Sequence, residues 1–489
     1  ALWIAESQML DETARIVGHH IDFLPLKTYT SIVEGNALRL DWNSVLPASE
    51  CSYIMGNPPF IGARMMKQGS EQKIEVEKIF GNIKDVQDLD YVTCWFKKAA
   101  EYIKTTKIEV SFVATNSICQ GAQVPILWGT LFKDYSININ FAYRTFKWEN
   151  EAVDKAAVHC IIVGFAQFYR SKKKIFDGGS TIIVDKISPY LTPNTLCFVD
   201  ARKDTITKGI PKMNMGNMAR DGGNFFLTAN QKDEVIRQEP SIAKWIHPFV
   251  GADEIIKGKQ RWCFWLEGIT PVEIINSKIL RSLVEKVKNF RLASSAKTTR
   301  NYANSPHLFA QRCQPSTNYL IVPRVSSEKR QYIPIAFMSP DAIASDSSLI
   351  VANIEVYHFG VLISSVHMAW MRAVAGRLKS DYRYSKDIVY NNFVWPEVDE
   401  AMKQKISKTA QGILDARAKY PEAALGQMYS NLDLFSDLQK AHKANDKAVL
   451  EAYGLKSDAS ESDIVAHLFK LYEEKVREEQ SATSDKTAG

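Results

Sequence analysis

The chain of 489 residues has no pair of cysteines at C-x-x-C spacing and no long apolar run. Its seven cysteines stand singly and no histidine lies at metal-ligand spacing from them, so we expect reduced thiols and no structural metal. No segment approaches the ~20 uninterrupted apolar residues of a membrane span, and the first residues lack the pattern of a signal peptide. These absences predict a cytoplasmic protein that has no membrane partner.

The composition that remains is that of an ordinary globular protein, with 45% apolar and 24% charged residues. The formal net charge of +6 is modest, but the charges are unevenly distributed. Residues 198–396 contain 27 Lys and Arg against 17 Asp and Glu, which leaves a net charge of −4 on the rest of the chain. A positive field in the middle of the chain suits a nucleic-acid phosphate backbone, although a solvated basic surface gives the same count.

Residues 1–197 alternate short β-rich runs with helical stretches, beginning with a helix at residues 2–10. This pattern predicts an α/β domain with a mostly parallel sheet. Strands are expected at 31–33, 53–55 and 110–114, and each leads into a polar turn, at Asn36, Asn57 and Asn116 respectively. Ligands bind at the carboxyl ends of strands in such sheets, so the three turns should border one crevice. Two later strands, 138–143 and 157–168, resemble an antiparallel closing edge.

The composition and the spacing of apolar runs change after residue 197. Residues 198–396 have longer connections that are rich in Gly, Asn, Ser and aromatic residues, which predicts a second domain of mixed α and β content. Helical patterns at 402–419, 434–453 and 462–478 predict a helical domain over 397–480. The small, polar tail at 481–489 is expected to be disordered.

The tetrapeptide Asn57-Pro58-Pro59-Phe60 follows a predicted strand and precedes a glycine-containing segment. The N6 atom of adenine is a poor nucleophile, because its lone pair is delocalised into the ring. The side-chain oxygen of Asn57 and a main-chain carbonyl, that of Pro58, would each accept one N6 hydrogen and direct the lone pair at a methyl donor. The consecutive prolines fix φ and contribute no N–H, so the loop is stiff and its carbonyls have no local donors.

Phe60 completes the interpretation of this loop. A base within a duplex cannot reach such a loop, so the adenine must be flipped out, and an aromatic face replaces about 1–3 kcal/mol of the stacking it loses. The alternative is a proline-stiffened turn that ends a strand, with Phe60 packed in the core.

This loop is the hallmark of amino-group methyltransferases, and the sequence resembles the adenine-N6 DNA enzymes. Closer still, it resembles the MmeI-like, type IIL and IIG restriction-modification proteins, which fuse endonuclease, methyltransferase and target-recognition domains in one polypeptide. Nearly the whole chain takes part in the resemblance, through blocks in one order at residues 1–9, 35–42, 57–60, 115–118, 146–152, 261–266, 376–385 and 441–446.

The resemblance implies a partial Rossmann-like class I methyltransferase domain with S-adenosylmethionine as methyl donor and double-stranded DNA as partner. It also implies that Asn36 contacts the adenine of the cofactor, although a simple turn asparagine is the alternative. In the family a glycine-rich cofactor loop precedes the helix at Leu2, and no such loop precedes Asn57 here. We therefore expect a fragment or a truncated gene product with an incomplete cofactor site, and the family's nuclease would lie upstream.

Related enzymes also place an aromatic residue against the flipped base, between the two late strands. Trp148 is the first candidate here and Phe146 the second, with core packing as the alternative for both. Asp88 and Asp90 precede a helix expected at 91–103, and we interpret them as helix-start carboxylates rather than catalytic groups.

Residues 376–386 combine Arg377, Lys379, Arg383 and Lys386 with a single acid, Asp381. An acid in a DNA-facing segment repels phosphate unless it faces a base edge. Lysine donates to guanine and aspartate accepts from cytosine, so Lys379 and Asp381 would read one G·C pair, sharing a face if they lie two apart on one strand. A surface salt bridge is the alternative.

Further candidates for phosphate or base contacts are Arg261, Arg312, Arg324 and Arg330. The predicted function is site-specific adenine-N6 methylation of DNA. The alternatives are a catalytically inert DNA-recognition fragment, or an amino-group methyltransferase for RNA or protein glutamine, against which the basic middle region and the family blocks argue. The sequence leaves the oligomeric state open, with a monomer favoured.

Overall fold

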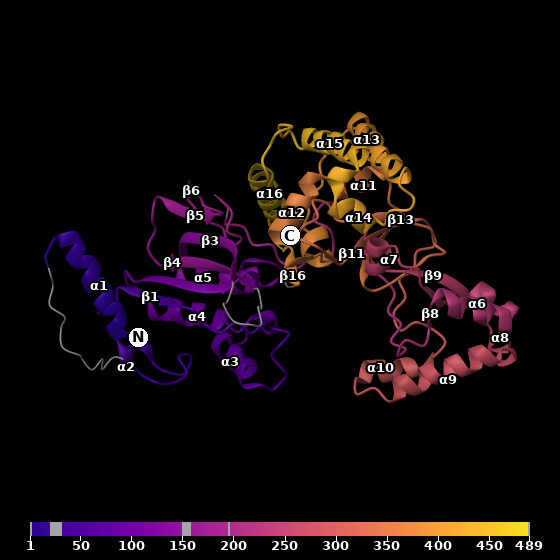
Figure 1. The fold of residues 1–489 in the computed structure, drawn as a ribbon, viewed down its shortest axis with the longest axis horizontal. Helices are drawn as coiled ribbons and strands as arrows, with labels where there is room; N and C mark the ends of the chain where they lie inside the picture. The colour runs from indigo at the N-terminus through magenta and orange to yellow at the C-terminus, as the bar shows by residue number, and fades with distance from the viewer. Residues whose placement is uncertain (1, 20–31, 149–157, 194–195, 379, 488–489) are drawn as a thin grey trace.

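The computed structural model describes residues 2–19, 32–148, 158–193, 196–378 and 380–487. Figure 1 shows an elongated molecule with an α/β region at one end and residues 220–310 at the other. The C-terminal helices lie between them, so the chain runs out to the far end and then returns toward its beginning. The mixed α/β class with a helical C-terminal region, predicted from the sequence, is confirmed.

A six-stranded sheet forms the first region. Its strand order is β1-β2-β4-β3-β5-β6, and β1 pairs parallel to β2 as β3 does to β5. Because β4 is antiparallel to both β2 and β3, the strands β1, β2, β3 and β5 all run the same way and end at one edge. The bounds are β1 Tyr53–Gly56, β2 Glu109–Thr115, β3 Asn138–Trp148, β4 Val158–Ala166, β5 Lys173–Asp177 and β6 Ser180–Val184.

One face of this sheet is covered by helices. Residues of β2 alternate between buried and half-buried, as expected for a strand with one covered face. Phe96 of α4 packs on Phe112 of β2 and Phe165 of β4, with ring centroids 5.3 and 5.6 Å away. The helices of this region are α1 Leu2–Val17, α2 Trp42–Val45, α3 Glu71–Phe80, η1 Val86–Asp88, α4 Thr93–Tyr102, η2 Asn116–Cys119 and α5 Gln123–Tyr135.

The strand expected at 31–33 is not found in the part that the structure describes. Residues 32–34 are irregular, while residue 31 lies outside the described residues. Two apolar β-branched residues followed by Glu34 and Gly35 are too short a run to decide for a strand without a neighbouring partner.

The second region contains two four-stranded sheets, β14-β9-β10-β8 and β13-β11-β15-β7, and a small sheet β12-β17-β16. A separate core around Phe225, Phe249 and Phe309 supports the far end. Arg291 is fully buried there and donates to five backbone carbonyls, including those of Ala219 and Leu308, which fastens α9 to the surrounding loops.

The strands of the second region are β7 Met213–Met215, β8 Phe226–Leu227, β9 Ile246–Val250, β10 Trp262–Phe264, β11 Tyr319–Pro323, β12 Val325–Ser326, β13 Ala336–Met338, β14 Ile343–Ala344, β15 Ser348–Ala352, β16 Gly376–Leu378 and β17 Asp381–Arg383. Its helices are α6 Ala229–Gln238, η3 Pro240–Trp245, α7 Ala252–Lys257, α8 Pro271–Asn276, α9 Lys278–Leu292, α10 Lys297–Asn301, η4 Tyr302–Asn304, α11 Val356–Leu362, α12 Ser365–Val374 and the π-helical turn η5 Lys386–Tyr390.

The C-terminal helices are α13 Glu400–Ala418, α14 Leu425–Ser430, η6 Leu432–Leu434, α15 Ser436–Ala452 and α16 Glu461–Thr487. They share one continuous core with the first region, and α16 brings Phe469 against Tyr190 at 5.3 Å. The expectation of a disordered tail from residue 481 is wrong as far as Thr487, since α16 continues to that residue. A helix that tertiary packing has already nucleated gains one hydrogen bond for each residue added, so α16 continues through 481–487 even though Ser, Thr and Asp have only modest helix propensity. Among the described residues, no helix is long and apolar enough to cross a membrane.

Candidate functional site

The loop that follows β1 lies at the edge of the sheet where the parallel strands end. Asn57 is exposed, and neither its side chain nor the Pro58 carbonyl has a hydrogen-bond partner among the described residues. Pro58 is buried, whereas Phe60 is half-buried and packs against the main core. The prolines thus anchor a loop whose Asn57 amide is available to a ligand. Phe60 combines core packing with a partly accessible ring.

Two residues at the start of α4 connect this loop to both other turns. The Asp90 carboxylate accepts from the Ala63 amide at 2.7 Å and from the Ser117 hydroxyl, and the Tyr91 amide donates to the Ile61 carbonyl at 2.9 Å. The interpretation of Asp90 as a helix-start carboxylate is therefore wrong. The N-cap of α4 is Val92, which makes no side-chain bond, and Asp90 is directed at the two loops instead. Asp88 ends η1 and is exposed.

Asn36 forms a tight turn. Its side-chain oxygen accepts from the Leu38 amide at 2.9 Å, and its Nδ2 donates to Glu75 at 2.9 Å. Glu75 also accepts from Arg39 at 2.7 Å and from the Tyr91 hydroxyl. Burial, together with the Glu75 carboxylate, raises the pKa of Tyr91 well above its usual range. The turns at Asn36, Asn57 and Asn116 are thus joined through Asp90 and Tyr91, and a cofactor contact of Asn36 remains a prediction.

The aromatic candidates lie at the end of β3. Phe146 is half-buried, and the strand extends to Trp148, whose side chain lies outside the described residues. The pairing of β3 with β4 is irregular between Tyr143 and Phe146. Because β3 runs parallel to β2, this strand end belongs to the same edge as Asn57 and Asn116. A role beside a flipped base stays a prediction.

The segment 376–383 is a hairpin. Leu378 of β16 and Asp381 of β17 are register partners on antiparallel strands, so the single strand on which Lys379 and Asp381 would share a face does not exist. A turn this short reverses the chain within two residues, which the alternating pattern did not reveal. Lys379 itself lies outside the described residues.

The side chains of this hairpin differ in how they are held. Arg377 lies over the Tyr382 ring at 3.7 Å and donates to the Ser380 carbonyl at 2.7 Å. Asp381 is half-buried. Burial lowers the pKa of Arg330, and the nearby Asp381 carboxylate partly offsets this effect. The Arg383 backbone pairs with the neighbouring strands, but its side chain makes no hydrogen bond or ion pair with another described residue, which leaves its guanidinium available.

The other arginine candidates are engaged within the protein. Arg261 pairs with Glu254 at 3.1 Å and lies over Phe249. Arg312 pairs with Glu267 at 3.2 Å. Arg324 donates to the Asp346 carbonyl at 3.1 Å, and Arg330 donates to the Ser430 hydroxyl at 3.2 Å. Each of these four arginines thus has a partner within the protein, and their contacts with a nucleic acid stay predictions.

The hairpin meets the sheet edge directly. The Gly121 amide, which follows η2, donates to the Val374 carbonyl immediately before the hairpin at 3.1 Å. A cavity of about 540 Å³ opens at this junction, and its lining includes Asn116, Gln120, Arg144, Arg377 and Tyr382. Residues far apart in the sequence thus place the hairpin beside the turn after β2. Sequence reasoning missed the contact between Gly121 and Gly376 and the bonds of the Asp90 carboxylate. The polar turn at Asn116 was the signal nearest to both.

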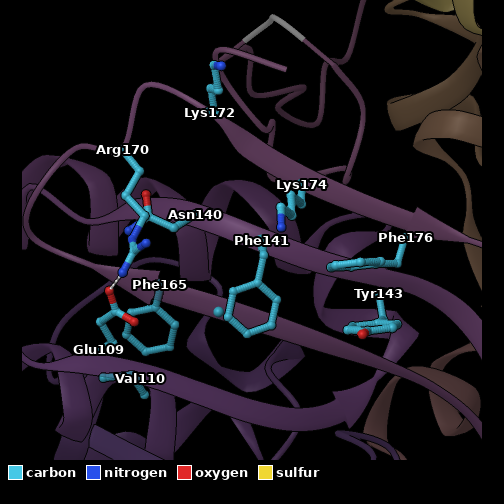
Figure 2. A pocket seen from close by; sticks show the side chains of 11 residues that line it. Glu109, Val110, Asn140, Phe141, Tyr143, Phe165, Arg170, Lys172, Lys174 and Phe176 are labelled. Atoms are coloured by element: carbon cyan, nitrogen blue, oxygen red, sulfur yellow. Dashed lines mark hydrogen bonds and ion pairs between the residues drawn. The ribbon is translucent and has the colours of Figure 1, made fainter. Parts of the chain in front are cut away.

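A second hollow, of about 330 Å³, lies on the face of the sheet that the helices leave open (Figure 2). Phe141 lies across Gly164, where a Cβ atom would come within 2.0 Å of the ring, and Tyr143 stacks on Phe176 at 4.2 Å. Glu109 begins β2 and pairs with Arg170, while Asn140 stands near the start of β3. This hollow is centred on the beginnings of the parallel strands, so it is not part of the Asn57 edge.

Comparison with known proteins identifies each region. Family models match three consecutive stretches: the MmeI DNA-methyltransferase domain at residues 1–177, the MmeI target recognition domain at 193–397 and the MmeI C-terminal domain at 398–478. The chain is 38% identical over 478 residues to DNA methyltransferase A of Bacillus subtilis (strain 168), which covers 97% of this chain and 54% of that protein.

A solved structure is similar as well. The type IIL restriction-modification enzyme MmeI in complex with DNA superposes with a TM-score of 0.86 at 41% identity, over 97% of this chain and 64% of that one. The chain spans about half the length of its curated relative and under two thirds of the solved one. With the MmeI methyltransferase, target recognition and C-terminal domains matched at residues 1–177, 193–397 and 398–478, the chain belongs to the MmeI family.

Proposed function

We propose that the protein is the base-handling and DNA-reading part of a site-specific DNA methyltransferase that acts on adenine N6. The observation that carries the proposal is the unpartnered Asn57 amide on a proline-stiffened loop at the carboxyl end of β1. The relatives named as a DNA methyltransferase and as a DNA-bound restriction-modification enzyme support it.

The loop has the groups that the reaction needs. The Asn57 Oδ1 atom and the Pro58 carbonyl would accept the two N6 hydrogens, which localises the nitrogen lone pair. Neither acceptor has a partner among the described residues, so a substrate amine would displace no protein bond. The accessible part of Phe60 would stack on an adenine flipped out of the duplex, with Trp148 and Phe146 as candidates for its other side.

S-adenosylmethionine is the donor that the methyltransferase domain implies, and when bound it would supply an electrophilic methyl group. The residues of this chain fit it in part. The Asn36 turn and the Asn57 loop are tied together through Tyr91 and lie beside the strand ends where ligands of such sheets bind. Asn36 uses its amide within the protein, so its role toward the donor would be limited to its second lone pair and second hydrogen.

The DNA-reading role rests on the recognition region. Residues 198–396 carry the positive charge excess of the chain, and the Arg383 side chain of the hairpin is free of hydrogen bonds and ion pairs among the described residues. The hairpin contacts the sheet edge at Gly121, so a base pair read by the hairpin would lie at a fixed distance from the Asn57 loop.

The full-length enzyme that contains this chain tests the proposal. Incubation with a library of duplexes and labelled S-adenosylmethionine, followed by nucleoside analysis, should yield N6-methyladenine at one sequence context. Asn57→Ala should lower kcat at least about a hundredfold, because it removes one of two acceptors, and should leave DNA affinity nearly unchanged. Methylated cytosine as the sole product, or full activity of Asn57→Ala, would contradict the proposal.

Binding by the isolated chain distinguishes the inert-fragment alternative. A titration of these 489 residues with S-adenosylmethionine that shows no binding, together with specific DNA binding, would assign recognition to this chain and catalysis to the longer protein. Tight binding of the donor would show that the residues present here are sufficient for the cofactor site.

A further inference from the structure

Asp90 is a buried carboxylate without a cation. Its exposed fraction is 7%, and the partners of its carboxylate are one backbone amide and one hydroxyl, with no Lys or Arg in contact among the described residues. Burying a carboxylate away from water is costly unless its oxygens are hydrogen-bonded. Both side-chain oxygens are bonded here, Oδ1 by the Ala63 amide and Oδ2 by the Ser117 hydroxyl.

The two donors belong to different loops at the same edge of the sheet. Ala63 follows Phe60 by three residues, and Ser117 follows Asn116 in the turn after β2. The strands that precede these loops, β1 and β2, are parallel neighbours, with Tyr53 in register with Glu109. The carboxylate therefore connects the loops that leave two adjacent strands.

Backbone bonds hold Asp90 itself in place. Its amide donates to the Gln123 side chain at 2.9 Å, and its carbonyl accepts from Thr93 at 2.7 Å. The next amide, of Tyr91, donates to Ile61 at 2.9 Å. Since α4 begins without a side-chain cap, the carboxylate is not needed to start the helix, and its bonds serve the loops.

We propose that Asp90 is a positioning residue for methyl transfer. It fixes the end of the Asn57 loop against the turn at Ser117, so that Asn57 and Phe60 hold one geometry toward the base. Asp90 acts through the loop and does not touch the substrate. The inference rests on the proposed function, because the loop's task is taken from it.

The test compares Asp90→Ala, Asp90→Asn and Asp88→Ala in the full-length enzyme. Asp88 is the matched control, because it is exposed and lies two residues away. Asp90→Ala should lower kcat about tenfold to a hundredfold, the effect of misplacing reacting groups, with the KM for DNA within about twofold of wild type. Asp90→Asn should keep most activity, since its oxygen accepts from Ala63 and its amide donates to Ser117.

A base-flipping probe separates positioning from general damage. With 2-aminopurine in place of the target adenine, wild type should raise the fluorescence on binding, and Asp90→Ala should bind equally but raise it less. A parallel loss of thermal stability and DNA affinity with unchanged kcat would overturn the inference, as would an Asp90→Asn variant as inactive as Asp90→Ala. If wild type methylates cytosine instead, the adenine proposal fails, whereas a kcat loss of Asp90→Ala on that substrate still supports positioning.

Discussion

Gly121 and Gly376 meet where the recognition hairpin touches the edge of the methyltransferase sheet. A Cβ atom on Gly121 would lie 3.0 Å from the Cα of Gly376, and Gly121 has a φ of +60°. Both the close approach and the left-handed backbone require glycine at position 121. The contact sets how closely the hairpin approaches the turn after β2.

Gly121→Ala should therefore lower the free energy of unfolding by about 1–3 kcal/mol, through the φ cost and the steric overlap. Gly129→Ala is the control. Gly129 lies within α5, where a Cβ would meet nothing within 4 Å, so alanine should stabilise the protein by about 0.5–1 kcal/mol. Thermal and urea denaturation measure both, and equal effects of the two substitutions would show that the junction is not tightly packed.

Tyr429 joins two buried side chains of the C-terminal region. Its hydroxyl accepts from Arg417 Nε at 3.0 Å and contacts His442 Nε2 at 2.7 Å. Tyr429→Phe leaves both groups without this partner and should reduce the free energy of unfolding by about 1–3 kcal/mol. Tyr420→Phe is a control, since the Tyr420 hydroxyl has no hydrogen bond among the described residues. A Tyr429→Phe protein as stable as wild type in urea would argue against this network.

The buried His367 should make the free energy of unfolding depend on pH. It is fully buried with its Nε2 at 2.8 Å from the Tyr384 hydroxyl, and burial lowers its pKa to about 3. The unfolded chain binds the proton near pH 6.5 while the folded protein does not, so stability is complete above that pH. It should fall by about 1.4 kcal/mol per pH unit as the pH drops further. In urea denaturation between pH 7.5 and 5, His367→Gln should flatten this decline, and parallel curves for variant and wild type would refute it.

Arg383 should contribute a phosphate contact. Its side chain is free among the described residues, so Arg383→Ala should weaken DNA binding and reduce the slope of log K against log salt by about one. Arg312→Ala, which removes an arginine paired with Glu267, should change the slope less. Titrations at several salt concentrations compare them, and an unchanged slope for Arg383→Ala would exclude this contact.

Lys379 and Asp381 remain the candidates for base reading at the hairpin. Exchanging the two residues in the full-length enzyme should change the preferred base pair without abolishing DNA binding, because the donor and the acceptor of the base edge would trade places. The methylation sites on a randomised duplex library measure the preference. The proposal fails if the exchanged enzyme keeps the original sequence preference.

The sequence by itself determined the elements that local patterns encode, and it supplied the prediction for the chemistry of the Asn57 loop. Strand β2 and the C-terminal helices α13, α15 and α16 were predictable, because burial on one face imposes a period on the chain. Strand β1 is mostly exposed and was marked instead by a short β-rich run before a polar turn. Asn57-Pro58-Pro59-Phe60 was recognisable for a different reason: its stiffness and its carbonyls without local donors follow from neighbouring residues alone.

Tertiary structure decided what depends on residues distant in sequence. From its sequence position Asp90 is a helix-start carboxylate, but in the fold its two oxygens accept from Ala63 and Ser117. The prediction that Lys379 and Asp381 share a face of one strand was wrong. Over so few residues, a single strand and a hairpin have the same alternating sequence pattern. Long-range contacts such as that between Gly121 and Gly376 are set by the packing of whole sheets and helices, which no local pattern contains.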